Sequence, residues 1–262
     1  VQQAHDMAAI GHAATLRTRV PFLHFFDGFR TSHEESRLDR IDDDVLHEMI
    51  PDDLVLQNRA RGMTPDKPTI RGTAQNPDVF FQGREAANPL YAKTPEVVQE
   101  CMDKFAKLTG RQYHLVDYVG DPAAENVIVA MGSACETIEE TLAHLPMGLG
   151  LVKIHLFRPF PKEAFLKALP KTVKRIAVLD RCKEPGALGE PLYQDVKTVV
   201  GDSAEVFGGR YGLGSKEFKP RDVKAVYENL IRGELHHNFT VGIDDDLSGL
   251  SLKTDPAFAV QD

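Results

Sequence analysis

The sequence predicts an α/β protein with a mainly parallel sheet, and three observations support this fold class. From Asn126 onward, short apolar runs alternate with amphipathic helical stretches, a pattern typical of parallel strands covered by helices on both faces. The N-terminal stretch places an apolar run directly after a helix, which is half of an α/β unit. Finally, a hydrophobic content of 42% and a charged content of 27% over 262 residues are ordinary for a folded chain of one or two domains.

The first predicted region, residues 1–108, begins with this helix and apolar run. An Ala-rich helix is expected over Gln3–Thr18, with Met7 among the residues of one face. An apolar strand is expected over Val20–Phe26, and it ends at the turn residues Asp27-Gly28. The chain opens at Val1 directly in the helical pattern and without Met, so we expect a piece cut from within a domain.

The middle of this first region predicts little regular structure. Pro and Gly are frequent over 31–92, so we expect an irregular segment that covers another surface, with short helices only near 42–50 and 54–61. The pair Thr94-Pro95 then provides an N-cap and a Pro at the first helical position. This pair predicts the start of a helix that ends at Gly110.

In the second predicted region, residues 109–262, strands and helices alternate. Strands are expected at 126–131, 149–157, 175–179 and 205–207. Helices are expected at 136–145, 162–169, 192–200 and 223–231. The tail after Gly233 shows no period and is expected to pack as an arm.

Composition and charge exclude several classes of function. The formal net charge is −8, and the cations are spread along the chain, which argues against a nucleic-acid binder. No apolar run reaches the roughly 20 residues of a membrane span, and no leader is visible. The three cysteines, Cys101, Cys135 and Cys182, form no C-x-x-C pair, so an iron–sulfur cluster cannot be held by this segment alone. We therefore expect free thiols in a reducing cytoplasm.

Two glycine-containing turns are candidate phosphate sites. Gly132-Ser133-Ala134-Cys135 lies between a predicted strand and a predicted helix, where a phosphate could bind the helix N-terminus. The G-x-G-x-x-G fingerprint is absent, so a tight turn is the favoured interpretation. The run 208–216 (GGRYGLGSK) has the wrong order for a P-loop, and a flexible bend is favoured over a ligand loop.

A third pattern resembles a calcium-binding loop. Asp244, Asp246, Ser248, Gly249 and Asp255 stand at positions one, three, five, six and twelve of such a loop. The twelfth residue is Asp rather than Glu, and no pair of flanking helices is predicted. Calcium binding is therefore not the favoured interpretation.

A polar cluster follows the first predicted strand. His24, Asp27, Arg30, His33 and Glu34 lie at its carboxyl end, where open α/β sheets bind ligands. Two interpretations stay open. The segment could shape a ligand site or an adjoining domain contact, or it could be a turn held by a structural Arg30–Glu34 pair.

Several long blocks of this sequence resemble pyruvate:ferredoxin (flavodoxin) oxidoreductases, and they occur in the order found in that family. The blocks are HFFDGFRTSHE (24–34), RGTAQNPD (71–78), FQGREAANP (81–89), YVG (118–120), VAMGSACET (129–137), VLDRCKEPG (178–186), GRYGLGSKEF (209–218) and FTVG (239–242). The resemblance covers nearly the whole chain, from Val1 to about Phe258.

The resemblance implies a place for each region in a larger multidomain enzyme. Residues 1–108 are similar to the C-terminal part of a thiamine pyrimidine-binding α/β domain, and residues 109–262 to the transketolase C-terminal-like parallel-sheet domain. The complete enzyme of this family would convert pyruvate, CoA and oxidised ferredoxin to acetyl-CoA, CO₂ and reduced ferredoxin. It would use thiamine diphosphate, Mg²⁺ and [4Fe-4S] clusters, pass electrons to ferredoxin or flavodoxin, and form a homodimer.

The resemblance also implies what this segment lacks. The family residues that activate thiamine and contact pyruvate would lie before Val1, and the diphosphate, Mg²⁺, cluster and main CoA segments would follow Asp262. We therefore expect no catalytic residue, no metal site and no cofactor held by this chain alone, and no cofactor-binding residue can be assigned. Two alternatives stay open, namely a part of another thiamine-dependent 2-oxoacid:ferredoxin oxidoreductase and a stand-alone α/β interaction module.

Overall fold

The protein is described by a computed structural model that covers residues 1–68, 74–231 and 235–260, except the side chain of Arg30. These residues form two compact units. The first unit consists of residues 1–25 and 35–114, and the second of residues 26–34 and 115–262. We call residues Phe26–Glu34 the strap, because this short piece of chain belongs to the second unit although it interrupts the first in sequence.

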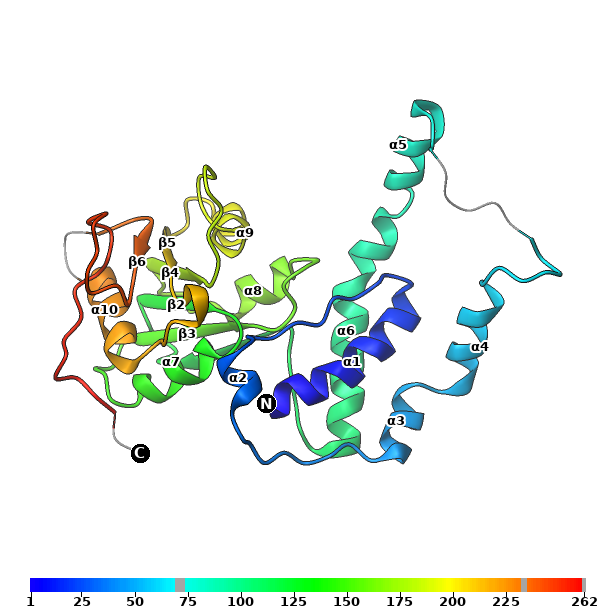
Figure 1. Cartoon of the computed structure of the whole chain (residues 1–262), viewed down its shortest axis with the longest axis horizontal. Helices are drawn as coiled ribbons and strands as arrows, with labels where there is room; N and C mark the ends of the chain where they lie inside the picture. The colour runs from blue at the N-terminus through cyan, green and yellow to red at the C-terminus, as the bar shows by residue number, and fades with distance from the viewer. Residues whose placement is uncertain (69–73, 232–234, 261–262) are drawn as a thin grey trace. The chain divides into compact units, whose positions relative to one another are not determined.

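The first unit is helical in its described part. Its helices are α1 (Gln2–Thr18), α3 (Asp43–Met49), α4 (Asp52–Ala60), α5 (Pro77–Glu85) and α6 (Asn88–Thr109). Helix α1 crosses α6 and packs against it (Figure 1), and α3 packs on both. Ile10 and Ala14 of α1 are buried, as are Met102 and Phe105 of α6. The predictions of α1 and of two short helices near α3 and α4 are confirmed.

Three predictions for the first unit are wrong. The predicted strand Val20–Phe26 has no strand structure, and Leu23 is 85% exposed. A strand needs a neighbour for its backbone hydrogen bonds, and the described part of this unit contains nothing longer than an isolated bridge between Thr64 and Lys67. The expected irregular segment contains α5 as well.

Helix α6 also begins earlier than predicted. It starts at Asn88 with Pro89 in its first turn, so that Pro95 lies inside it. The hydroxyl of Thr94 donates a hydrogen bond of 2.8 Å to the carbonyl oxygen of Leu90 instead of capping the helix start. The predicted end is confirmed, because Gly110 adopts the left-handed conformation with φ 76°.

A buried carboxylate joins α1 to the chain beyond α6. Asp6 accepts hydrogen bonds from Arg111 Nε at 2.7 Å, from Arg111 Nη2 at 3.0 Å and from the Tyr113 hydroxyl at 2.7 Å. Burial acts to raise the pKa of Asp6, but the hydrogen bonds from Arg111 and Tyr113 outweigh it, so the pKa lies below its usual value. Asp6 is therefore ionised at neutral pH and holds the two segments together.

The second unit contains a six-stranded sheet of order β1-β3-β2-β4-β5-β6. Its strands are β1 (Val116–Gly120), β2 (Asn126–Ala130), β3 (Leu149–Ile154), β4 (Arg175–Asp180), β5 (Glu205–Arg210) and β6 (Phe239–Thr240). Only β1 runs antiparallel to its neighbour, with Val116 opposite Ile154, and the other pairs are parallel. The four predicted strands and the mainly parallel sheet are confirmed, whereas β1 and β6 were not predicted.

Helices cover both faces of this sheet, as the alternation predicts (Figure 1). They are α7 (Ala134–Leu142), α8 (Lys162–Ala168), α9 (Pro191–Val200) and α10 (Pro220–Ile231), and the short elements α2 (Arg30–His33) and η1 (Leu213–Ser215) complete the unit. Helices α7 and α10 pack together on one face, and α8 and α9 on the other. Ile128, Leu151, Ile138 and Val226 are fully buried in the core beneath α7 and α10.

Residues 235–260 form strand β6 and then continue over the second unit. The backbone N–H of Leu252 donates a hydrogen bond of 2.9 Å to the carbonyl oxygen of Thr240 in β6. Lys224 of α10 forms an ion pair of 2.7 Å with Asp255 and lies 4.8 Å from the ring centre of Phe258. None of the helices in the described ranges is both long and apolar enough to span a membrane.

Candidate functional site

The carboxyl ends of three parallel strands bring four of the sequence blocks together in the second unit. Ser133 follows β2, Arg181 follows β4 and Gly212 follows β5. Because parallel strands end at the same sheet edge, these residues lie close to one another. The fourth contributor is Asp27 of the strap. We call Asp27, Ser133, Arg181 and Gly212 the strand-end cluster.

The carboxylate of Asp27 lies at the centre of this cluster. Its Oδ2 accepts a hydrogen bond of 2.6 Å from the backbone N–H of Ser133, at the N-terminus of α7. Its Oδ1 lies 3.0 Å from Nη1 of Arg181, and the Asp27 side chain is only 13% exposed. The Arg181 Nε in turn donates a hydrogen bond of 3.1 Å to the carbonyl oxygen of Gly212. A helix N-terminus and a guanidinium both favour a negative charge here.

Two glycines leave the space that the cluster needs. Gly132 has φ +76°, and a Cβ atom built on it would lie 2.7 Å from Asp27 Oδ2. Gly212 has φ +64°, and its Cβ would lie 3.0 Å from Arg181 Nε. Both positions therefore require glycine for backbone conformation and for space.

The nucleophilic groups near the cluster are not activated. Burial raises the pKa of the Cys135 thiol to about 12, so this thiol stays protonated at neutral pH and is a poor nucleophile. Burial also raises the pKa of the Tyr211 hydroxyl, and the ring packs 4.7 Å from that of Phe218. Burial raises the pKa of Cys182 to about 11. The arrangement holds segments together and shows no activated nucleophile among these groups.

A second polar group lies beside the cluster at the end of β4. Both oxygens of Asp180 accept hydrogen bonds of 3.0 Å from the backbone N–H groups of Leu192 and Tyr193, in the first turn of α9. Burial raises the pKa of Asp180 to about 6, although these two hydrogen bonds act in the opposite direction. Nearby, Glu190 and Arg210 form a buried ion pair of 3.3 Å.

The polar residues predicted after the first strand are only partly brought together. Asp27 enters the strand-end cluster, whereas His33 is exposed and its Nδ1 lies 2.5 Å from the carbonyl oxygen of Phe29 within the strap. His24 and Glu34 are exposed. The side chain of Arg30, and with it the expected Arg30–Glu34 pair, lies outside the described residues.

The remaining candidate motifs have structural partners. The turn at Gly132-Ser133 receives the carboxylate of Asp27, in agreement with the favoured tight-turn interpretation. In the calcium-like loop, Asp246 accepts hydrogen bonds from the backbone N–H of Ser248 and that of Ser251 at 2.8 and 2.7 Å. Within 1–68, 74–231 and 235–260, no three or more His, Cys, Asp or Glu residues gather as a metal site would require.

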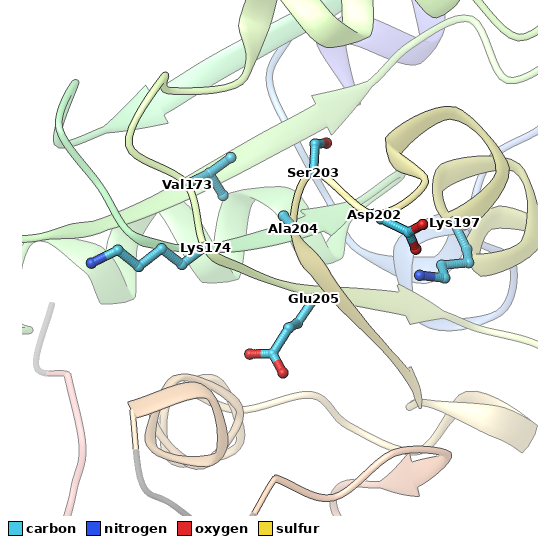
Figure 2. A pocket seen from close by; sticks show the side chains of 7 residues that line it. All are labelled: Val173, Lys174, Lys197, Asp202, Ser203, Ala204 and Glu205. Atoms are coloured by element: carbon cyan, nitrogen blue, oxygen red, sulfur yellow. The ribbon is translucent and has the colours of Figure 1, made fainter.

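One shallow hollow of about 370 Å³ lies at the opposite, amino-terminal edge of the sheet (Figure 2). Its lining residues are Val173, Lys174, Lys197, Asp202, Ser203, Ala204 and Glu205. Both lysines have partners, because Lys174 pairs with Glu125 at 2.6 Å and Lys197 donates to the carbonyl oxygen of Gly201 at 3.0 Å. The hollow therefore lies at the sheet edge opposite the strand-end cluster. Both of its lysines already have partners.

Sequence reasoning missed the role of Arg181 and Gly212, although both stand in motif blocks. The available signal was position, since each follows a buried strand of the same parallel sheet. In the block RGTAQNPD, Arg71-Gly72-Thr73 lies outside the described residues.

Comparison with known proteins connects these blocks to one family. The family model described as pyruvate flavodoxin/ferredoxin oxidoreductase, thiamine diphosphate-binding, matches residues 1–103. The model described as pyruvate:ferredoxin oxidoreductase core domain II matches residues 124–223. Among solved structures, a 2-oxoglutarate:ferredoxin oxidoreductase from Magnetococcus marinus aligns with 60% of this chain and 26% of its own, at 16% identity and a TM-score of 0.35.

Curated relatives match over the whole chain. The pyruvate-flavodoxin oxidoreductase of Rhodospirillum rubrum is 54% identical over 276 residues, covering 100% of this chain and 23% of that protein. The pyruvate:ferredoxin oxidoreductase of Moorella thermoacetica is 55% identical, covering 97% of this chain and 22% of that protein. The chain thus spans less than a quarter of the length of these relatives. The two family models and these identities show that it belongs to the pyruvate:ferredoxin (flavodoxin) oxidoreductase family.

Proposed function

We propose that this chain forms a structural part of an enzyme that oxidises pyruvate with CoA to acetyl-CoA and CO₂ and passes the electrons to ferredoxin or flavodoxin. The observation that carries the proposal is the identity of 54% over the whole chain to the Rhodospirillum rubrum pyruvate-flavodoxin oxidoreductase. The chain matches 23% of that relative, so the remaining domains of the same enzyme are its first proposed partners. In the complete enzyme we propose a homodimer in the cytoplasm.

We also propose a domain assignment. Residues 1–108 correspond to the end of the pyrimidine-binding domain, and residues 109–262 to the transketolase C-terminal-like domain. In support, the thiamine diphosphate-binding family model ends at residue 103 and the core domain II model begins at residue 124. The compact units divide after His114 and assign the strap to the second unit, so the strap would be a piece of the first domain that packs with the second.

The residues at the sheet edge do not fit thiamine diphosphate on their own. A diphosphate needs free N–H donors or cations, and its Mg²⁺ needs oxygen ligands. In the strand-end cluster, the Ser133 N–H and the Arg181 guanidinium are already bonded to Asp27. The described residues also contain no acidic group of three or more side chains for a metal. We therefore assign thiamine diphosphate, Mg²⁺, the [4Fe-4S] clusters and the CoA site to the complete enzyme.

Binding measurements on the purified chain test this proposal. Isothermal titration calorimetry with thiamine diphosphate and Mg²⁺ should give no heat of binding, and the chain should release no CO₂ from pyruvate. The complete enzyme, assayed with pyruvate, CoA and ferredoxin or flavodoxin, is the positive control. Binding to the isolated chain at micromolar concentration would contradict the assignment, and an inactive complete enzyme would contradict the function itself.

We further propose that residues His24–Glu34 lie near the thiamine site of the complete enzyme and help to shape it or the adjoining domain contact. Its support is the position of Asp27 at the carboxyl edge of a parallel sheet, where α/β proteins bind ligands. The test is to replace Arg30 or His33 with Ala in the complete enzyme. Loss of turnover or thiamine affinity at unchanged melting temperature supports the proposal. A fall in melting temperature alone assigns these residues a structural role.

A further inference from the structure

We infer that the carboxyl edge of β2, β4 and β5 is an intramolecular docking surface whose occupant is the strap, and that the Asp27 carboxylate is the group by which the strap is held. This inference concerns the chain itself and does not depend on the proposed activity. It extends the two family models, neither of which includes both sides of the contact, since one matches 1–103 and the other 124–223.

The charge and the hydrogen-bond donors of the sheet edge match the Asp27 carboxylate. The sheet edge offers Asp27 a backbone N–H at 2.6 Å and a guanidinium at 3.0 Å, on opposite oxygens of one carboxylate. The guanidinium is itself oriented by the carbonyl oxygen of Gly212 at 3.1 Å. Two segments of the sheet edge therefore contact one acidic side chain, and a third orients the guanidinium that binds it.

The shape of the turn at Gly132 also matches the Asp27 side chain. A Cβ atom on Gly132 would lie 2.7 Å from Oδ2 of Asp27 and 3.3 Å from its Cγ. Such a contact would force the carboxylate away from the turn. The absence of a side chain at Gly132 thus forms the space into which the Asp27 side chain fits.

Asp27 is less exposed than its neighbours in the strap. The Asp27 side chain is 13% exposed, whereas Phe26 is 56% and Phe29 67% exposed. None of the described strap side chains belongs to the buried core of the second unit. The strap therefore lies on the surface of a core that is complete without it, and Asp27 is its charged attachment.

The strap also holds a local shape of its own. Phe29 adopts φ 55°, which is uncommon for a residue other than Gly. Its carbonyl oxygen accepts a hydrogen bond of 3.0 Å from the Ser32 hydroxyl, and its ring lies 5.1 Å from that of His33. These contacts stay within the strap, so we expect residues 29–33 to keep this local shape when the Asp27 contacts are lost.

The test uses the whole chain with Asp27→Asn and Asp27→Ala, and Glu34→Gln as the matched control. Glu34→Gln removes one negative charge from the same strap at an exposed position. Trypsin cleavage after Arg30 is followed by mass spectrometry, and amide hydrogen exchange is followed at Ser133 and in the sheet. Asp27→Ala should accelerate cleavage and Ser133 exchange about 10- to 100-fold, because cleavage follows the open population and a charge-assisted hydrogen bond is lost. Asp27→Asn, which retains an acceptor for Ser133, should have a smaller effect.

The sheet provides the deciding comparison. Amides of β2 and β4 should keep their protection in every Asp27 variant, while Gly132→Ala should release the strap as Asp27→Ala does. Equal cleavage rates in Asp27→Ala and Glu34→Gln would overturn the inference. So would an equal loss of protection in the strap and in β2 and β4, because the contact would then be part of the core rather than a docking contact on it.

Discussion

The two units bury their apolar side chains to different extents. The second unit encloses residues such as Ile128, Leu151 and Val226 completely between sheet and helices. In the first unit, α4 and α5 contain no buried residue at all. Helices of nine residues are marginal without tertiary packing. One chain can therefore contain both a unit that completes its own core and a unit whose peripheral helices bury no residue.

The exposed side chains of the first unit indicate where further contacts would form. Large apolar residues that are more than one third exposed in this unit include Leu23, Phe25, Leu56, Met63, Val79, Phe80, Phe81, Leu90 and Tyr91. Three of them, Val79, Phe80 and Phe81, are consecutive on α5. Grouped exposed apolar residues mark interaction surfaces. The remaining domains of the complete enzyme, already proposed as partners, are the expected occupants.

The largest expected effect comes from the closed core. Leu151 is fully buried in the centre of β3, so Leu151→Ala should lower the free energy of unfolding by about 2–5 kcal/mol, through lost burial and the cavity that remains. The measurement is urea denaturation of the second unit's transition, followed by circular dichroism. Leu247→Ala, at a fully exposed position of the same unit, should change it by less than about 0.5 kcal/mol. Similar losses in both variants would contradict the closed-core description.

The next effect concerns the buried carboxylate of the first unit. Asp6→Asn should destabilise that unit by about 1–3 kcal/mol, because a carboxamide cannot accept all the hydrogen bonds that Arg111 and Tyr113 donate. The pKa of Asp6 is lowered in the fold, so its contribution is present above the unfolded-state pKa and is lost as the pH falls through the folded-state pKa. The difference between wild type and variant should therefore shrink in acid.

Glu96→Gln is the control for this comparison, because Glu96 is an exposed acidic residue on α6 of the same unit. Thermal unfolding at neutral and acidic pH is the measurement for both variants. An Asp6→Asn variant as stable as Glu96→Gln at neutral pH would show that the Asp6 network does not hold α1 in place.

The second unit should show the opposite pH dependence through Asp180. Burial raises its pKa from 3.8 to about 6, so the folded state binds a proton more tightly than the unfolded state. The contribution of Asp180 to stability therefore falls as the pH rises from about 4 to about 6 and is constant above. The fall should be of the order of 1–3 kcal/mol, since one pKa unit corresponds to about 1.4 kcal/mol.

Asp180→Asn isolates this contribution. The variant should lose the downward slope between about pH 4 and about pH 6 that wild type shows in urea midpoints. Its stability at neutral pH also reports the loss of one α9 hydrogen bond. Asp202→Asn, which removes one acidic group at an exposed position of the same unit, should keep the wild-type slope. An unchanged slope in Asp180→Asn would assign the pH dependence to another group.

The smallest effect is a difference in local opening between the units. Under limited proteolysis, residues 35–92 of the first unit should be cut about tenfold faster than residues 126–179 of the second, because segments with few buried contacts open most readily. Fragments identified by mass spectrometry give the order of cleavage. Faster cutting within 126–179 would contradict the expectation that the first unit opens more readily than the second.

Periodic segments of this sequence predicted their structure well. The runs that became β2, β3, β4 and β5 are apolar and bounded by turn residues, and each lies in the centre of a sheet. The apolar composition of such segments is itself enough to indicate that they are buried. Strand β1 was missed because it is a short edge strand in which Asp117 and Tyr118 are only partly buried. The apolar run at Val20–Phe26 was wrongly predicted to be a strand, because the local sequence does not show whether a neighbouring strand is present to pair with it.

The strand-end cluster could be predicted only in part. Asp27 was recognised as a candidate because it follows an apolar run, and the turn at Gly132-Ser133 because it follows a strand. Their contact spans 106 positions of sequence, and no local pattern encodes such a pairing. For Arg181 the signals were its place in a motif block and its position after a buried strand, and neither identifies its partner.

The strap also sets an order of events during synthesis. Asp27 leaves the ribosome 106 residues before Ser133, and Arg181 follows later still. Contacts at such separation form slowly, because loop closure opposes them until the distant partners exist. Because Asp27 contacts residues that follow β2 and β4, its contact with the sheet edge is complete only after both of these strands have been synthesised.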